Sequence, residues 1–70
     1  MVINYDKTAD AMYIKLNDRI YAKNKRVLDG VVFDLDAEGE IIGIEILYAS
    51  QRVNNPYEVI SRYTAETAPE

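Results

Sequence analysis

The side chains best suited to chemistry in this 70-residue chain are the carboxylates near its centre. Residues 34–45 follow the spacing of a calcium loop, with oxygen ligands at alternate positions, then a glycine and a final glutamate. The residues at template positions 1, 3, 5, 6, 8 and 12 are Asp34, Asp36, Glu38, Gly39, Ile41 and Glu45. A calcium loop of this kind joins two helices, but both flanks here alternate with period two. We therefore interpret the match as a β-hairpin with solvent-facing carboxylates, and we expect no metal.

Carboxylates near the turns could also form an acid/base pair for hydrolysis. The candidates for such a pair are Asp6, Asp10, Asp34, Asp36, Glu38 and Glu40. One member of the pair needs a pKa shifted by burial, and the sequence places none of them in an apolar pocket. Ser50 and Ser61 have no His to activate them, and the chain has no Cys. We expect no catalytic residue and no cofactor, and we keep a carboxylate-dependent or metal-assisted hydrolase using the acidic turn as the alternative.

The charge balance disfavours two classes of partner. The chain has 8 basic and 12 acidic side chains, so its net charge is −4. This charge disfavours nucleic acid and anionic membranes and suits a basic protein partner. The basic residues 23–26 are typical of an exposed loop or sheet edge. No apolar run is long enough to span a membrane, and the first residues lack the features of a signal peptide, so we expect a cytoplasmic protein.

The acidic turn lies between two predicted strands. Residues 31–35 and 41–47 alternate with period two and are rich in Val and Ile, which predicts a hairpin with Gly39 in the turn at positive φ. The apolar side chains that fall on one face of this hairpin are Val31, Phe33, Leu35, Ile42, Ile44 and Ile46. Gly43 interrupts the second strand, and we expect an aromatic ring, Tyr13 or Phe33, to pack over it. An interface or ligand contact at Gly43 is the other interpretation.

A first hairpin is predicted before the central one. Residues 2–5 are short and apolar, a polar turn follows, and residues 11–16 alternate cleanly. Residues 19–26 have no clear period, although a strand over about residues 25–28 would lead into the turn at Asp29 and Gly30.

Helical signals follow the last strand. Apolar residues around Ala49 are spaced by three and four, which indicates a short helical turn. Asn55 as N-cap and Pro56 at the first position predict a helix from Pro56 to about Tyr63. Residues 64–70 are small and polar, and we expect a frayed tail.

The predicted fold is a single α+β domain over residues 1–63. It contains a small antiparallel β-sheet of four to five strands, built from β-hairpins, with one or two short C-terminal helices. One short helix covers one face of such a sheet at most, and a domain this small without disulfides needs further support. We therefore expect a homo-oligomer, with a dimer favoured. The residues expected at its interface are Tyr13, Val32, Ile41, Leu47 and Tyr48.

Two motifs indicate a family. The first contains Tyr5-Asp6, Ala9-Asp10-Ala11 and Tyr13-Ile14, and the second contains Gly43-Ile44-Glu45-Ile46-Leu47 followed by Ala49-Ser50. Over about residues 2–53, the chain resembles the domain-of-unknown-function 2283 family of small prokaryotic proteins. The resemblance implies no activity, cofactor or catalytic residue. Members are reported beside small toxin-like genes, so it does imply an antitoxin-type or accessory role.

The sequence therefore predicts a small protein that acts as a self-associating protein-interaction module. Its expected partners are a second copy and a basic protein, rather than nucleic acid or a membrane.

Overall fold

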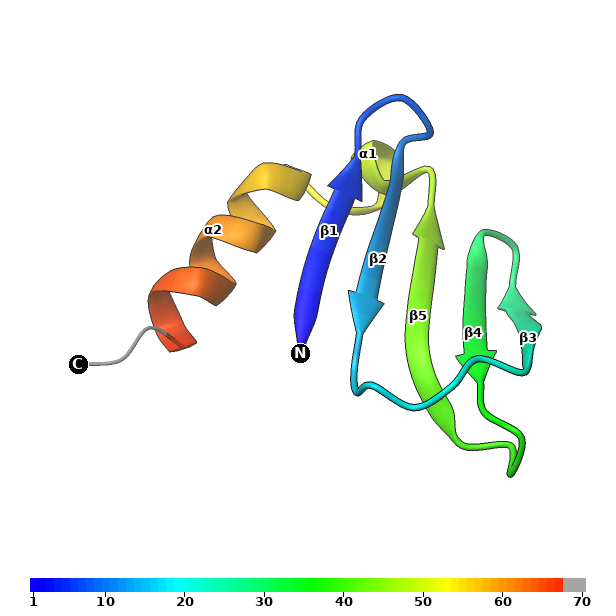
Figure 1. The fold of residues 1–70 in the computed structure, drawn as a ribbon. Helices are drawn as coiled ribbons and strands as arrows, with labels where there is room; N and C mark the ends of the chain where they lie inside the picture. The colour runs from blue at the N-terminus through cyan, green and yellow to red at the C-terminus, as the bar shows by residue number, and fades with distance from the viewer. Residues whose placement is uncertain (68–70) are drawn as a thin grey trace.

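Figure 1 shows the computed structural model of the chain, which describes the backbone of residues 1–67 and the side chains of residues 1–61. A five-stranded antiparallel sheet has the strand order β1-β2-β5-β4-β3, and two helices follow it. The elements in chain order are β1 (Val2–Asp6), β2 (Ala11–Lys15), β3 (Lys23–Leu28), β4 (Val31–Leu35), β5 (Ile41–Leu47), α1 (Ala49–Arg52) and α2 (Pro56–Thr67). The predicted α+β fold is confirmed.

The central hairpin, β4 and β5, has the predicted strands and turn. Phe33 pairs with Ile44 across the two strands, so the alternating apolar residues share one face as expected. Gly39 has a φ of 83° in the turn, which a residue without a Cβ adopts at little cost. The register then shifts, because Asp34 pairs with Gly43 whereas Leu35 pairs with Ile41. This β-bulge places one extra residue, Ile42, in β5 beside Gly43, and a glycine within a strand is a sign of such a bulge.

The strand that the sequence resolved least well, β3, forms one edge of the sheet. It begins at Lys23, two residues before the predicted start, and all six of its residues are exposed. The linker that precedes it, residues 16–22, crosses the ends of β5 and β4. The Leu16 N–H donates to the Ile42 carbonyl at 2.9 Å, and the Ala22 N–H donates to the Leu35 carbonyl at 2.8 Å. The linker is therefore fastened at both ends.

Both predicted helical segments are present. The short helix α1 follows Tyr48, which has a left-handed backbone conformation with φ 54°. Helix α2 begins at Pro56, and the Asn55 side-chain oxygen accepts the Tyr57 N–H at 3.0 Å, as an N-cap does. The helix continues to Thr67, so residues 64–67 of the expected tail are helical, and residues 68–70 lie outside the described part of the chain.

Cross-strand pairing assigns the side chains to two faces of the sheet. We call one the apolar face, and the residues on it are Ile3, Tyr5, Met12, Ile14, Val31, Phe33, Ile44 and Ile46. We call the other the mixed face, and it carries Tyr13, Lys15, Asn24, Arg26, Val32, Asp34, Glu45 and Leu47.

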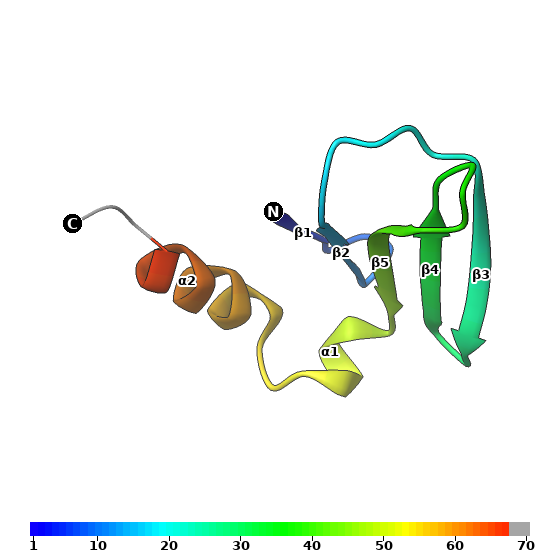
Figure 2. The same cartoon turned by 90° about the horizontal axis from the view of Figure 1, so that it is seen from below.

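The hydrophobic core is small because α2 does not lie across the sheet. Helix α2 packs at the β1 edge, where the Tyr57 ring meets the Tyr5 ring edge-on at 5.2 Å, and it extends beyond that edge (Figures 1 and 2). Within the described residues, the buried apolar side chains are those of Met12, Leu35, Ile42 and Ala49. The rest of the apolar face is half-buried, so the helices cover less of the sheet than the one full face that the sequence allowed.

Candidate functional site

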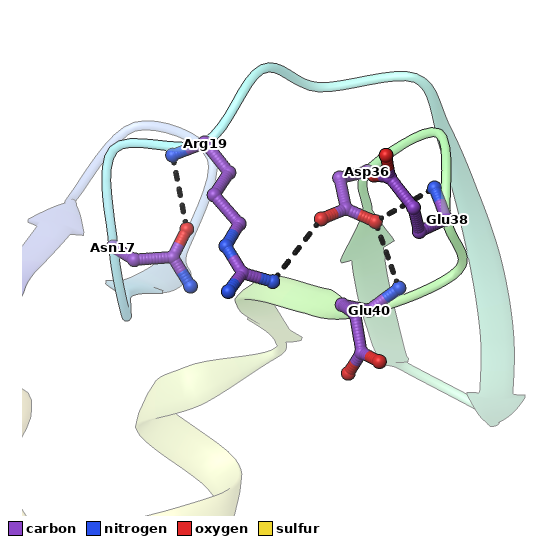
Figure 3. Close-up of polar contacts among 5 residues, drawn as sticks. All are labelled: Asn17, Arg19, Asp36, Glu38 and Glu40. Atoms are coloured by element: carbon purple, nitrogen blue, oxygen red, sulfur yellow. Dashed lines mark hydrogen bonds and ion pairs between the residues drawn. The ribbon is translucent and has the colours of Figure 1, made fainter.

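The acidic turn between β4 and β5 is organised by the Asp36 carboxylate (Figure 3). Its Oδ1 accepts the N–H groups of Glu38 and Glu40 at 3.0 and 2.9 Å, and its Oδ2 accepts a bond from Arg19 at 3.3 Å. The bond from the Glu40 N–H, helped by those from Glu38 and Arg19, holds the pKa of Asp36 below its usual value despite its burial. Asp36 therefore acts as a structural residue that fixes the shape of the turn.

One sequence prediction about these carboxylates is wrong. We expected them to face solvent, but Asp34 is only 8% exposed and Asp36 only 4%. Asp36 is enclosed by its own turn and by Arg19, whereas Asp34 lies on the mixed face beside Tyr13 and Glu45. The hairpin interpretation itself is confirmed, since strands flank the loop on both sides where a calcium loop needs helices. Among the described residues, no group of three or more acidic side chains is arranged to hold a metal.

A cluster of Tyr13, Asp34 and Glu45 occupies the centre of the mixed face. The Tyr13 ring packs over Gly43, as predicted, and a Cβ added to that glycine would lie 2.7 Å from the ring carbon Cζ. Hydrogen bonding to Asp34, followed by burial, raises the pKa of the Glu45 carboxyl. Burial, followed by bonding to Asp34, raises the pKa of the Tyr13 hydroxyl. Asp34 Oδ1 has no hydrogen-bond partner in the described part of the chain.

The Asp34 and Glu45 pair has the property that acid/base catalysis requires, a carboxyl group with a raised pKa. We named Asp34 as a candidate from the sequence but missed Glu45 as its partner. The available signal was the hairpin register, which sets the two residues on one face of adjacent strands. The unpartnered Oδ1 of Asp34 is itself inaccessible to solvent, so a substrate cannot reach that atom in this arrangement.

A surface hollow of about 700 Å³ opens between the linker and the acidic turn. It is lined by Arg19, Ile20, Tyr21, Ala22, Asp36, Ala37, Glu38 and Glu40. Ile20 and Tyr21 are 86% and 53% exposed, which is unusual for large apolar side chains that lie next to each other. We did not predict this site, because residues 19–26 have no readable period. The signal present was an apolar pair, Ile20 and Tyr21, within a polar linker.

A second, smaller hollow of about 470 Å³ lies at the opposite end of the sheet. Asp29, Tyr48, Gln51 and Arg52 line it. Arg52 donates to the Asp29 carbonyl at 2.7 Å and lies against Gly30, so it ties α1 to the turn between β3 and β4. We interpret this region as a structural contact.

The Asp10 carboxylate, in the first sequence motif, bonds to a residue of the second. It accepts the Tyr5 hydroxyl at 2.7 Å, the Ser50 N–H at 3.0 Å and the Ser50 hydroxyl at 2.7 Å. Its backbone carbonyl accepts the Ala49 N–H at 2.9 Å. The Tyr5 bond, followed by those from Ser50, lowers the pKa of Asp10, and the same contact raises the pKa of Tyr5 to about 12. These residues fasten α1 to the first hairpin, which indicates a structural role.

The structure brings together three of the five residues predicted for an interface. Tyr13 and Val32 both pair with Glu45, and Leu47 follows on the same mixed face, where all three are half-buried. Ile41 lies at the β-bulge, and Tyr48 lies beyond the end of β5, where it is 51% exposed. This interface stays a prediction.

Residues 2–50 match a protein family described as protein of unknown function, DUF2283. The chain belongs to the DUF2283 family. The matched region includes all five strands, the Asp10 contacts and the acidic turn, whereas α2 lies outside it. No curated protein and no solved structure gives a significant match to this DUF2283 chain. None of the helices in its described part is long and apolar enough to cross a membrane.

Proposed function

We propose that this DUF2283 protein is a small protein-interaction module that pairs with a second copy of itself through the apolar face of its sheet. The chain exposes 5222 Å² of surface, whereas a folded monomer of 8.0 kDa is expected to expose about 4,450 Å². Part of this excess of about 770 Å² comes from helix α2, which extends beyond the sheet, and part from the uncovered apolar face. The main support for the proposal is the apolar face itself, which the two helices leave half-buried.

The rest of the chain covers the apolar face only in part. Ile14, Phe33 and Ile44 lie on central strands but are only half-buried, because α2 packs beyond the β1 edge. The radius of gyration is 12.8 Å, compared with about 11 Å for a compact domain of this length. A sheet needs a second layer to bury its apolar face, and a second copy would supply that layer.

The interface predicted from the sequence is on the mixed face and competes with this proposal. Pairing two copies through Tyr13, Val32 and Leu47 would also bury the Asp34 and Glu45 carboxyl groups of both copies. The same face carries the cations Lys15 and Arg26, and desolvating this many charged groups in both copies is costly, so the mixed face is less suited to a homodimer. We therefore favour the apolar face.

Sedimentation velocity at micromolar concentration tests both faces with a matched pair of variants. Phe33→Asp places a charge on the apolar face, and Val32→Asp places the same charge on the mixed face of the same strand. We expect a dimer for the wild type and for Val32→Asp, and a monomer for Phe33→Asp. Far-UV circular dichroism checks that each variant is folded, and Phe33→Ser replaces the aspartate variant if that one unfolds.

Two results would contradict this expectation. A wild type that sediments as a monomer up to about 100 μM would rule out a stable dimer. A dimer with an interface of standard size should form well below that concentration. A dimer broken by Val32→Asp but not by Phe33→Asp would instead support the interface predicted from the sequence.

The proposal also includes a partner other than a second copy of the chain. We infer a basic protein partner in the cytoplasm, toward which this chain has an accessory or antitoxin-type role. The net charge of −4 supports a basic partner, and the family resemblance supports the accessory role. Co-purification of a basic protein that is lost at high salt is the expected outcome.

A hydrolase is the second candidate, and the Asp34 and Glu45 pair is the observation that favours it. The raised pKa of Glu45 would let it act as a general acid. Asp34→Asn should then abolish hydrolysis of ester or phosphoester substrates while the variant remains folded. Neither of the two hollows described above includes Asp34 or Glu45, so the interaction module remains the better-supported function.

A further inference from the structure

The hollow beside the acidic turn combines exposed apolar surface with a negative rim. Ile20 and Tyr21 supply the apolar surface, and their exposure of 86% and 53% means that little of the chain covers them. The Tyr21 hydroxyl accepts a bond from the Asn24 side chain at 3.2 Å, which orients the ring. An exposed aromatic ring held in one orientation is suited to contact a planar or cationic group.

The charges that line the hollow are unbalanced. One cation, Arg19, and three carboxylates, those of Asp36, Glu38 and Glu40, give a net charge of −2. Arg19 pairs with Asp36, so these two groups offset each other. The exposed side chains of Glu38 and Glu40 take part in no ion pair within the described residues. Their charge is therefore free to attract a cation.

The walls of the hollow are held in place before any ligand binds. On one side, the Ala22 N–H bonds to the Leu35 carbonyl, and the Arg19 guanidinium bonds to Asp36. On the other side, Asp36 fixes the backbone of Glu38 and Glu40 (Figure 3). Preorganised walls lower the entropic cost of binding.

We propose that this hollow binds a basic, partly apolar segment of another protein. An arginine side chain of the segment stacks on Tyr21 and directs its guanidinium toward Glu38 and Glu40, while a neighbouring apolar side chain covers Ile20. The charge complementarity selects a basic segment, and the planar guanidinium suits both the aromatic ring and the carboxylates. This inference rests on the proposed basic partner, but it does not depend on self-association through the apolar face.

Two short peptides test the site on the whole chain. The probes are acetyl-Leu-Arg-Leu-amide and its counterpart acetyl-Leu-Glu-Leu-amide. Each is titrated to millimolar concentration against isotope-labelled protein, and binding is followed by NMR. We expect saturable chemical-shift changes in the amides of residues 19–22 and 37–40 with the arginine peptide. The glutamate peptide should bind at least about tenfold more weakly, and added salt should weaken the arginine peptide.

Variants of the hollow show which side chains contribute to binding of the arginine peptide. Glu38→Gln and Glu40→Gln should each weaken the arginine peptide roughly two- to fivefold, as expected for exposed ion pairs. Ile20→Ser should weaken it by roughly three- to tenfold through lost apolar contact, and its side chain is too exposed to support the fold. Asp29→Asn removes the same charge at the other end of β3 and should leave the affinity unchanged.

The proposal is overturned if the arginine peptide gives no saturable shift, if both peptides bind equally, or if Glu38→Gln and Glu40→Gln bind like Asp29→Asn. Sedimentation of the same samples separates this result from the proposed self-association. A dimer that does not bind the peptide overturns only the site, and a monomer that binds it overturns only the dimer.

Discussion

Each end of the sheet has an aspartate that accepts several hydrogen bonds in a turn, but the two aspartates have different kinds of partner. At one end, Asp10 accepts hydrogen bonds in the turn between β1 and β2, and at the other, Asp36 does so between β4 and β5. The partners of Asp10 include Ser50, which is 40 residues away in the chain. The N–H groups that bond to the Asp36 carboxylate lie within four residues, and among the described residues its one distant partner is Arg19.

This difference in sequence separation explains why a second element packs against the Asp10 turn and none in the described part of the chain packs against the Asp36 turn. The long-range bonds of Asp10 hold α1 against the first hairpin, where Ala49 is fully buried. The local bonds of Asp36 shape a turn without drawing another element over it, so the hollow beside it stays exposed. A hydrogen-bonded aspartate in a turn therefore has a structural role at both ends, but of the two only Asp36 lines one of the hollows described above.

Replacing Asp10 should have the largest effect on stability. We expect Asp10→Ala to lower Tm by roughly 10 °C, because it removes the acceptor for Tyr5 and Ser50 and puts alanine at a φ of 51°. Asp10→Asn, which tolerates that backbone better, should lower Tm less. Asp36→Ala should also lower Tm less, since two of the side-chain bonds it removes lie within one turn and the third is to the exposed Arg19. Thermal denaturation measures all three, and an equal loss at Asp36 would remove the distinction between the two ends.

Acid should destabilise the protein through both aspartates. The folded pKa of each is below the ordinary 3.8, so the stability they contribute is present above about pH 4 and is lost as the pH falls through their folded pKa values. Urea denaturation between pH 2 and 7 should therefore show a falling free energy of unfolding below pH 4. Asp10→Asn and Asp36→Asn should each flatten that fall. An unchanged acid profile in Asp10→Asn would contradict its assigned contacts.

Glu45, which lies between the two ends, should respond to pH with the opposite sign. Its folded pKa is raised above 4.5, so the stability from the protonated form is present below pH 4.5 and is lost as the pH rises through the folded pKa. Glu45→Gln should remove this loss and stabilise the protein at neutral pH by about 1 kcal/mol, the contribution of one hydrogen bond to Asp34. The same urea series measures it, and a less stable variant at pH 7 would show that the Glu45 carboxylate contributes favourably there.

The smallest effect should come from Arg19→Ala. The Arg19 side chain is 59% exposed, and Asp36 keeps the N–H groups of Glu38 and Glu40 as donors without it, so Tm should fall by no more than about 3 °C. A fall as large as that of Asp10→Ala would mean that the Arg19 contact contributes as much to stability as the contacts of Asp10 do.

Most of the fold could be predicted because its signals are local. Alternation in residues 31–35 and 41–47 gave the central hairpin, and Asn55 with Pro56 gave the start of α2. Gly43 was a sign of a bulge or of a close approach in β5, but the residue inserted opposite Leu35 could not be predicted, since one extra residue leaves the apolar pattern nearly unchanged. The position of α2 beyond β1 depends on packing between distant elements, and no local pattern encodes it.

The candidate site was harder to predict for a related reason. Its acidic half was identified as a turn, but Asp34 and Asp36 were expected in solvent, because a carboxylate in an alternating strand normally faces outward. Their burial depends on Tyr13, Glu45 and Arg19, which approach only once the sheet has formed. The apolar half, Ile20 and Tyr21, lies in a linker that has no repeating pattern. Its path depends on the backbone hydrogen bonds of Leu16 and Ala22 to distant strands.

The strand order also constrains the route by which the chain can fold during its synthesis. The last strand made, β5, lies at the centre of the sheet and is the element that joins β2 to β4. Until it leaves the ribosome, the chain can form two separate hairpins but no continuous sheet. Each hairpin alone is marginally stable in water, so assembly must wait for residues 41–47 and then proceed in one cooperative step.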